Sequence, residues 1–181
     1  YSTLLWVRDH AEQLGIDVNQ IGVCGDSAGA NLAAAVALKA RDTGDVNLAF
    51  QALIYPCNDP EMNYESAQVN GSGYNLSTKA MKWFWERYLS KKSDFKNPYA
   101  VPIVAKDFKN LAPAIIITAE YDPLLDDGYN YAQLLKQGGV PTIYYEYPGM
   151  IHGFFSLAGV TPVALEAQSR LADEINALLT K

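Results

Sequence analysis

The sequence predicts an α/β protein, in which a mostly parallel sheet is covered by helices on both faces and one helical segment is inserted between two strands. Short apolar runs typical of buried strands alternate with longer helical patterns. The interval 58–111 interrupts this alternation, because it contains no strand pattern. Hydrophobic residues make up 49% of the 181 residues, so one core of ordinary size can form.

The first third of the chain predicts helix, strand and helix. Apolar residues recur at steps of three and four, which predicts an amphipathic helix that Gly15 ends. They are Leu4, Val7, Ala11 and Leu14. A short apolar run, Ile21–Cys24, predicts a buried strand, and the small apolar side chains of Ala28–Leu38 predict a buried helix.

Three more apolar runs predict the other strands. They are Leu48–Tyr55, Ala114–Ala119 and Thr142–Tyr147. A helical pattern over Leu124–Gln137 lies between the last two. A final amphipathic helix follows from Ala164, Gln168, Leu171, Ile175 and Leu178.

The interval after the second strand predicts a separate segment over the sheet edge. Ser77 is placed to cap an aromatic helix over Met81–Leu89. Long excursions of this kind often form lids over sites. We therefore divide the chain into a core at 1–57, a cap or lid at 58–98 and a second part of the core at 99–181.

Composition excludes several classes of function. There are 14 Lys and Arg against 20 Asp and Glu, a formal net charge of −6, and no basic cluster exceeds Lys91-Lys92. We expect no nucleic-acid partner, since phosphate binding needs a basic face. No apolar run is long enough to span a membrane. The pattern leaves a homodimer open.

The two cysteines, Cys24 and Cys57, predict neither a disulfide framework nor a zinc site. We expect both to be buried free thiols. The first residues lack the apolar core of a signal peptide, so a cytoplasmic location is expected.

A nucleophile motif follows the first predicted strand. Gly25-Asp26-Ser27-Ala28-Gly29 fits G-x-S-x-G and lies between a strand and a helix, as the chemistry requires. Gly25 and Gly29 let strand and helix approach closely, and Ser27 projects from a strained turn at a helix N-terminus. The alternative is an ordinary helix-capping serine.

Ser27 needs a base, and the chain has two histidines. His10 lies on the polar side of the first predicted helix, which suggests a surface residue. His152 follows the fourth predicted strand, at the sheet edge where ligands meet catalytic groups. We therefore predict that His152 is the base, the alternative being a structural loop histidine.

The base needs a carboxylate partner, for which Asp122 is the first choice. It follows the third predicted strand, whereas Asp126 and Asp127 fall in the first turn of the next helix, where acidic residues are favoured anyway. Glu120 is a third competitor. The order Ser27, Asp122, His152 is typical of α/β-hydrolases.

These motifs resemble the hormone-sensitive-lipase-like carboxylesterases of the α/β-hydrolase superfamily. The resemblance rests on the nucleophile motif Gly25–Asn31, on Asp122-Pro123-Leu124 followed by Asp126, and on His152-Gly153-Phe154, and it extends to Trp83-Phe84-Trp85 and Asn97-Pro98-Tyr99. It implies an α/β-hydrolase fold and hydrolysis of short- to medium-chain carboxylic esters through an acyl-serine, with no metal or organic cofactor.

One family feature has no counterpart. The family's His-Gly-Gly motif lies upstream of the serine and supplies most of the oxyanion hole, which leaves the backbone N–H of Ala28 as the donor we can name. We expect the chain to be the C-terminal part of a longer esterase, with an incomplete sheet and severely impaired activity on its own.

Two other functions stay open. A peptidase or amidase of the same superfamily would use the same triad, and a noncatalytic ligand-binding module would use the same fold, although such modules lack the histidine present here. Aromatic side chains of the cap, Tyr74, Trp83 and Phe84, are candidates for the substrate pocket, or else pack the cap onto the sheet.

Overall fold

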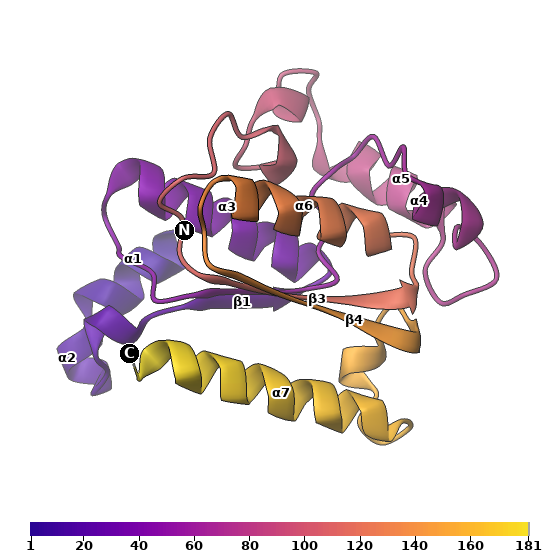
Figure 1. The fold of residues 1–181 in the computed structure, drawn as a ribbon. Helices are drawn as coiled ribbons and strands as arrows, with labels where there is room; N and C mark the ends of the chain where they lie inside the picture. Colours follow the sequence, from indigo (N-terminus) through magenta and orange to yellow (C-terminus); the bar gives the residue numbers. More distant parts are fainter. Residues whose placement is uncertain (181) are drawn as a thin grey trace.

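The computed structural model, which describes residues 1–180, contains one four-stranded parallel sheet (Figure 1). The strands are β1 (Val23–Asp26), β2 (Gln51–Ile54), β3 (Ala114–Tyr121) and β4 (Thr142–Ile151), and they pair in chain order. The predicted α/β class is confirmed. Because all strands run in the same direction, their carboxyl ends meet at one edge of the sheet.

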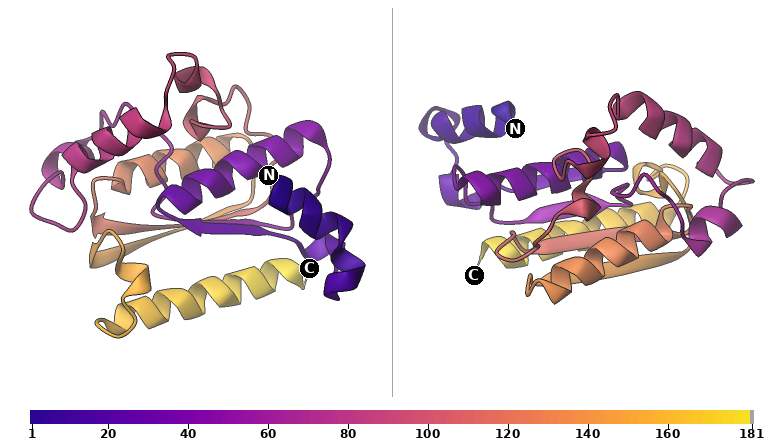
Figure 2. Two further views of the ribbon diagram at one scale, coloured as in Figure 1. Left: turned by 180° about the vertical axis from the view of Figure 1, so that it is seen from behind. Right: turned by 90° about the horizontal axis from the view of Figure 1, so that it is seen from above.

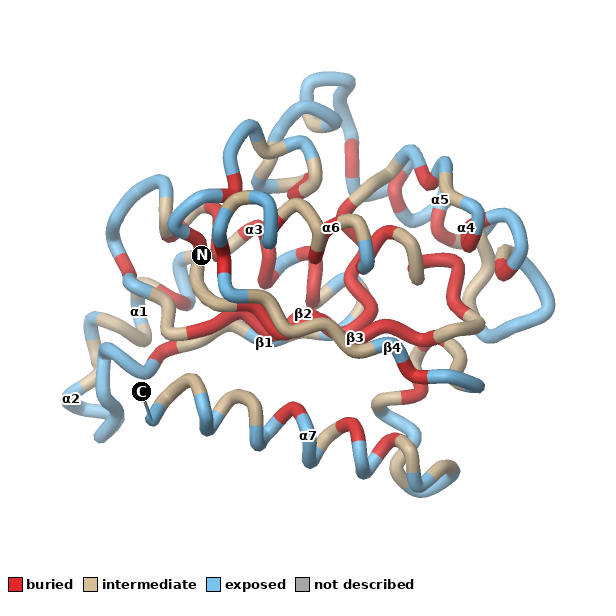
Figure 3. The backbone as a smooth tube through the Cα atoms, viewed as in Figure 1, coloured by how far each residue is buried: buried red, intermediate tan, exposed pale blue. Residues whose placement is uncertain are grey.

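Helices cover both faces of the sheet (Figures 1 and 2). Helices α3 (Ala28–Thr43) and α6 (Leu125–Gln137) lie on one face, and α7 (Pro162–Leu179) lies on the other. The strand side chains alternate between the two faces. Leu53 and Ile116 join the core under α3 and α6, whereas Ile54 and Ile117 join the core under α7. Figure 3 shows the buried residues concentrated in the sheet and on the helix sides that face it.

Helix α3 packs closely on the sheet because its buried face consists mainly of alanines. They are Ala30, Ala33, Ala34, Ala35, Ala37 and Ala40. Small side chains let the helix axis approach the strands, and Leu38 fills the remaining space. Gly44 ends the helix in the left-handed conformation, with φ 68°.

The chain begins with two helices where the sequence pattern predicted one. Helices α1 (Ser2–Asp9) and α2 (Ala11–Leu14) are separated by His10, whose ring stacks on Trp6. Only Leu4 of these helices is buried, so little tertiary packing holds a continuous helix together. A 3₁₀ turn, η1 (Val18–Gln20), then leads into β1.

The predicted first strand begins two residues too early, and Cys24 is not buried as expected. Ile21 packs with Leu4 before β1 begins, and β1 extends to Asp26. β1 is an edge strand of this sheet, and its Cys24 is exposed, whereas Cys57 is buried. Both thiols are free.

The larger, first part of the segment 58–98 lies near the end of the sheet where the arrowheads of β3 and β4 point, whereas its last residues lie above the face that α3 and α6 cover (Figure 1). It contains α4 (Glu65–Val69), α5 (Thr78–Tyr88) and a 3₁₀ turn, η2 (Asp94–Lys96). As predicted, the Ser77 side chain caps α5, accepting a hydrogen bond from the backbone of Ala80 at 3.2 Å. Met81 and Trp85 pack with Leu124, which follows β3, so this segment is anchored beside the end of the sheet.

Two short 3₁₀ turns complete the fold. They are η3 (Pro102–Val104), before β3, and η4 (Phe154–Ser156), after β4. Within residues 1–180, no helix combines the length and apolar character needed to cross a lipid bilayer.

Candidate active site

The site lies where the four strands end. Ser27, Tyr55, Asp122 and His152 are each the first residue after a strand, in the order β1, β2, β3, β4. Parallel strands place these residues at one edge of the sheet, although they are far apart in sequence. The fold therefore brings the predicted nucleophile, acid and base together without any long side chain having to reach across the molecule.

The turn at Ser27 is strained in the way the motif predicts. Ser27 has φ 53° and ψ −119°, a backbone conformation that residues other than glycine rarely adopt. A Cβ on Gly25 would overlap the backbone of Gly29, so position 25 requires glycine. At Gly29 itself a Cβ would meet only Asp26, at 3.9 Å, so the close approach depends on Gly25. The Ser27 N–H donates to the carbonyl of Ile54 at 2.9 Å, which ties the turn to the end of β2.

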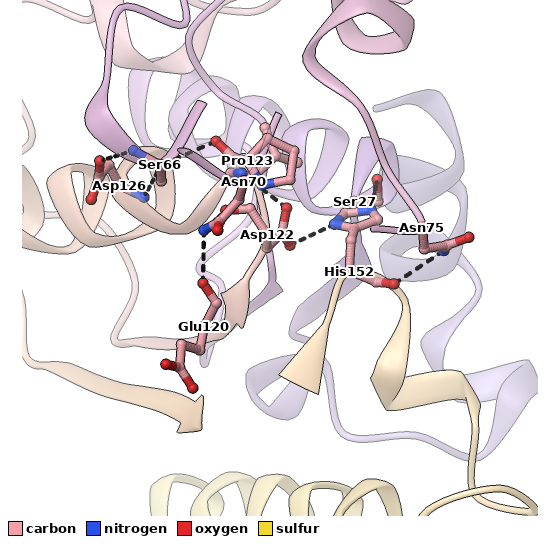
Figure 4. A network of polar contacts seen from close by, with 10 residues as sticks. Ser27, Ser66, Asn70, Asn75, Glu120, Asp122, Pro123, Asp126 and His152 are labelled. Carbon is pink, nitrogen blue, oxygen red and sulfur yellow. Dashed lines mark hydrogen bonds and ion pairs between the residues drawn. The ribbon is translucent and has the colours of Figure 1, made fainter. Parts of the chain in front are cut away.

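Three side chains form a continuous hydrogen-bonded chain (Figure 4). The Ser27 Oγ lies 3.0 Å from His152 Nε2, and His152 Nδ1 lies 2.7 Å from Asp122 Oδ2. With the proton on Nδ1, the imidazole donates to Asp122 and leaves Nε2 able to accept the Ser27 proton. This is the arrangement that general-base activation of a serine requires.

The acid and the base are shielded from water. Asp122 is fully buried and His152 is 7% exposed. The second carboxylate oxygen of Asp122 accepts the N–H of Leu124 at 2.9 Å, so both oxygens are paired. The Tyr55 ring packs on the imidazole, 4.5 Å between centroids, and burial raises the pKa of its phenol, so Tyr55 stays neutral beside the base.

The other candidates for the acid and for the base make different contacts. Glu120 accepts the N–H of Gly149 at 2.6 Å, and Asp126 accepts the N–H of Ser66 at 2.8 Å. Asp127 is buried and accepts the N–H of Asn58 at 2.8 Å. His10 is tied to its own helix, with Nδ1 2.8 Å from the carbonyl of Trp6.

Ala28 is the first residue of α3, directly beside Ser27. Its N–H lies at the positive end of the helix, where the first N–H groups have no partner within the helix. The N–H groups of Ala30 and Asn31 instead donate to the carbonyl of Ser27, at 3.0 and 3.2 Å. The arrangement leaves the Ala28 N–H able to face a developing oxyanion. Among residues 1–180, no cluster of three His, Cys, Asp or Glu side chains could hold a metal ion.

An apolar cavity of about 440 Å³ opens beside Ser27. Its lining comes from Ser27 and α3, from the chain after β2 and from the segment 58–98. The lining residues are Ser27, Ala28, Asn31, Leu32, Cys57, Leu76, Met81, Phe84, Trp85 and Tyr88. Burial raises the pKa of the Cys57 thiol, which leaves it protonated and unsuited to act as a nucleophile.

The cavity includes one of the three predicted pocket residues. Phe84 lines it, but Trp83 lies in a separate shallow cleft with Lys82 and Glu86, and Tyr74 stacks on Tyr121 at 5.1 Å between centroids. The structure therefore does not place Tyr74 and Trp83 on the wall of this cavity. The helical period explains the different position of Trp83, because positions 81, 84, 85 and 88 share one face of α5 and position 83 does not.

Other residues of the site had no separate signal in the sequence. Tyr55 follows β2 with φ 36°, and nothing in Tyr55-Pro56 indicates contact with a histidine. Asn31 donates to the carbonyl of Cys57 at 2.8 Å and so fixes the start of α3 against the chain after β2. The α5 face could have been found by testing the i, i+3, i+4, i+7 spacing.

Comparisons with known proteins show which proteins this chain is similar to. Residues 1–156 match a family described as having the alpha/beta hydrolase fold. Esterase LipI of Mycobacterium tuberculosis is 40% identical over 167 residues, 91% of this chain and 52% of the relative. An arylesterase of Saccharolobus solfataricus is 37% identical over 155 residues, 85% of this chain and 50% of the relative.

Solved structures show the same likeness. EstE1, a thermostable carboxylesterase cloned from a metagenomic library, superposes with a TM-score of 0.94 at 37% identity, covering 99% of this chain and 62% of that one. An esterase of Pyrobaculum calidifontis gives 0.91 at 43% identity, covering 97% and 58%. The chain spans about half the length of the curated relatives it matches. It belongs to the hormone-sensitive-lipase-like carboxylesterase family of the α/β-hydrolase superfamily.

Proposed function

We propose that this chain carries the Ser27–His152–Asp122 triad of a hydrolase that cleaves carboxylic esters through an acyl-serine intermediate. The observation that carries the proposal is the pair of hydrogen bonds at His152, 3.0 Å to Ser27 Oγ and 2.7 Å to Asp122 Oδ2. The esterase names of the relatives support the substrate class.

In the first half-reaction, His152 Nε2 takes the Ser27 proton as Oγ forms a bond with the ester carbonyl carbon. Asp122 stabilises the imidazolium, and the Ala28 N–H stabilises the oxyanion. When the tetrahedral intermediate collapses, the bond to the leaving alcohol oxygen breaks and His152 gives that oxygen its proton. The product is an acyl-serine and a free alcohol.

In the second half-reaction, water replaces the alcohol. His152 removes a proton from water as the water oxygen forms a bond with the acyl carbon. The bond between the acyl carbon and Ser27 Oγ then breaks, and His152 gives the proton to Oγ. The carboxylic acid leaves and the triad returns to its starting state. The proposed reaction uses neither metal nor organic cofactor.

The cavity supports a substrate with an apolar group of modest size. Its walls beside Ser27 are Leu32, Leu76, Met81 and Phe84, which would contact an acyl chain but offer it no charge partner. The volume of about 440 Å³ suits short- to medium-chain acyl groups. The segment 58–98 would then serve as the cap that supplies this wall.

An ester and an anilide with the same acyl group test the proposal. We expect the ester to be hydrolysed faster, and Ser27→Ala to abolish turnover while the circular dichroism spectrum stays that of the parent. Faster cleavage of the anilide would favour the peptidase or amidase alternative. Undiminished ester turnover by Ser27→Ala would refute the assignment of Ser27.

Location and oligomeric state stay predictions. The expected cytoplasmic location is checked by cell fractionation, and the homodimer that the sequence leaves open is checked by light scattering of the purified protein.

A further inference from the structure

The segment 66–75, here called the clamp, lies across the loops that carry the acid and the base (Figure 4). It consists of most of α4 and the turn that follows. At its start, Ser66 Oγ donates to the carbonyl of Pro123 and accepts the N–H of Asp126, both at 3.1 Å. The Asp126 carboxylate in turn accepts the Ser66 N–H at 2.8 Å. Three hydrogen bonds therefore join the start of α4 to the chain just after Asp122.

The middle of the clamp contacts the end of β3 and the Asp122 that follows it. Asn70, which ends α4 and is 7% exposed, donates from Nδ2 to the carbonyl of Glu120 at 2.9 Å and to the carbonyl of Asp122 at 3.4 Å. Tyr74 stacks on Tyr121, which lies between those two residues. A buried amide that bonds carbonyls on both sides of one residue restricts the backbone there.

The end of the clamp contacts His152, the first residue after β4. Asn75 Nδ2 donates to the carbonyl of His152 at 3.1 Å. The approach is close, since a Cβ on Gly153 would lie 3.3 Å from the same nitrogen. The ends of β3 and β4 also pair directly, with Tyr121 opposite Ile151 after an irregularity in the register. Glu120 at the end of β3 accepts the N–H of Gly149 in β4, but that hydrogen bond lies at the exposed surface, where water competes with it.

We propose that Asn70 and Asn75 are positioning residues, which hold the Asp122 and His152 backbones at the separation that their side-chain hydrogen bond requires. The proposal rests on the function proposed above. Neither residue touches the reacting atoms: each acts through the carbonyl of a triad member. Because Leu76 follows Asn75 and lines the cavity, the same stretch of chain fixes the triad and one wall of the pocket.

Asn70→Ala and Asn75→Ala test the proposal through kcat. A displacement of about 1 Å at a catalytic group can cost about 100-fold in rate, so we expect kcat to fall about 10- to 100-fold. KM should change little, since neither side chain lines the cavity. Rates are expressed per serine titrated with a fluorophosphonate, so a variant that merely loses folded molecules keeps its kcat. The control is Gln68→Ala on the exposed side of α4, for which we expect the parent's kcat.

A second readout does not depend on turnover. The proton on His152 Nδ1, held by Asp122, gives a downfield NMR signal, and we expect it to shift or broaden in both alanine variants. The chain has one other histidine, His10, which stacks on Trp6 and serves as the internal reference. If an alanine variant does not fold, Asn70→Ser or Asn75→Ser replaces it, because serine is too short to reach the carbonyl but leaves a group that water can solvate.

The outcomes separate the two proposals. Reduced kcat together with an altered His152 signal supports the clamp. Folded variants with the parent's kcat and signal overturn it and leave the esterase assignment standing. A parent whose Ser27 forms no fluorophosphonate adduct, but whose His152 signal changes in the variants, refutes the proposed function and keeps the positioning role.

Discussion

Two buried carboxylates near the site, Asp122 and Asp127, have different environments. Asp122 pairs with His152 and with the N–H of Leu124. One carboxylate oxygen of Asp127 accepts hydrogen bonds from the N–H groups of Asn58 and Asp59, at 2.8 and 3.1 Å. Its other oxygen has no hydrogen-bond partner among the described residues. Burial raises the pKa of Asp127, and the negative charges of Asp59 and Asp122 raise it further.

The raised pKa of Asp127 predicts a pH-dependent cost to stability. Between the unfolded pKa of about 3.9 and the higher folded pKa, the folded chain binds more protons, so its free energy of unfolding falls as pH rises. Asp127→Asn keeps an acceptor oxygen but does not titrate. We therefore expect the unfolding free energy of the variant, minus that of the parent, to increase with pH across this window by up to about 1.4 kcal/mol per unit.

Urea unfolding of parent and variant at a series of pH values measures this difference. The control is Asp173→Asn, since Asp173 is exposed on α7 and should give a difference that does not vary with pH. The groups facing Asp127 are Asp59, Asp122, Cys57 and Tyr64, and all are retained in the variant. A difference for Asp127→Asn that stays constant from pH 4 to pH 8 contradicts the account.

Two faces of helix α5 border different cavities. One face, Met81, Phe84, Trp85 and Tyr88, borders the cavity at Ser27, and the adjacent Trp83 points to a separate cleft. Phe84 and Trp83 are aromatic neighbours with nearly equal exposure, 51% and 52%. They form a matched pair for testing whether this face contacts the acyl group.

Phe84→Ala should reduce the preference for longer acyl chains. A hexanoyl chain would lose apolar contact with the ring, whereas an acetyl group would not reach it, so we expect the ratio of kcat/KM for the two esters to fall about 10-fold. Trp83→Ala should leave the ratio within about twofold of the parent. The measurement is kcat/KM on nitrophenyl esters of increasing chain length. Equal changes in the two variants would show that the face of α5 does not select the acyl group.

At the scale of the whole molecule, the parallel sheet explains why the triad motifs could be found from sequence. The runs ending near Cys24, Ala119 and Tyr147 are apolar because side chains of each join the cores on the two faces of the sheet, and a site residue follows each run after a few residues. The order and the glycines of the motif then suffice to nominate Ser27, Asp122 and His152. The structure brings all three within hydrogen-bond distance.

What could not be predicted depends on contacts between segments far apart in the chain. Asn70 and Asn75 look like ordinary turn residues in the sequence. Their hydrogen bonds to the carbonyls of Asp122 and His152 form only because α4 and the turn after it lie against the ends of β3 and β4. Cys24 was misjudged because an apolar strand gives no sign of being at the sheet edge. The contacts and the exposure of these residues depend on which distant segments lie beside them, and the local sequence pattern does not show this.

If His152 and Asp122 activate Ser27, a fluorophosphonate, which tags activated serines, will bond to that residue. Intact-mass spectra followed by peptide mapping compare the parent with Ser27→Ala and His152→Ala. We expect one adduct on Ser27 in the parent, none in Ser27→Ala, and labelling at least about 100-fold slower in His152→Ala, since the general base is lost. A parent without an adduct, an adduct on another residue, or labelling of His152→Ala at the parent's rate would refute the activation of Ser27 by this triad.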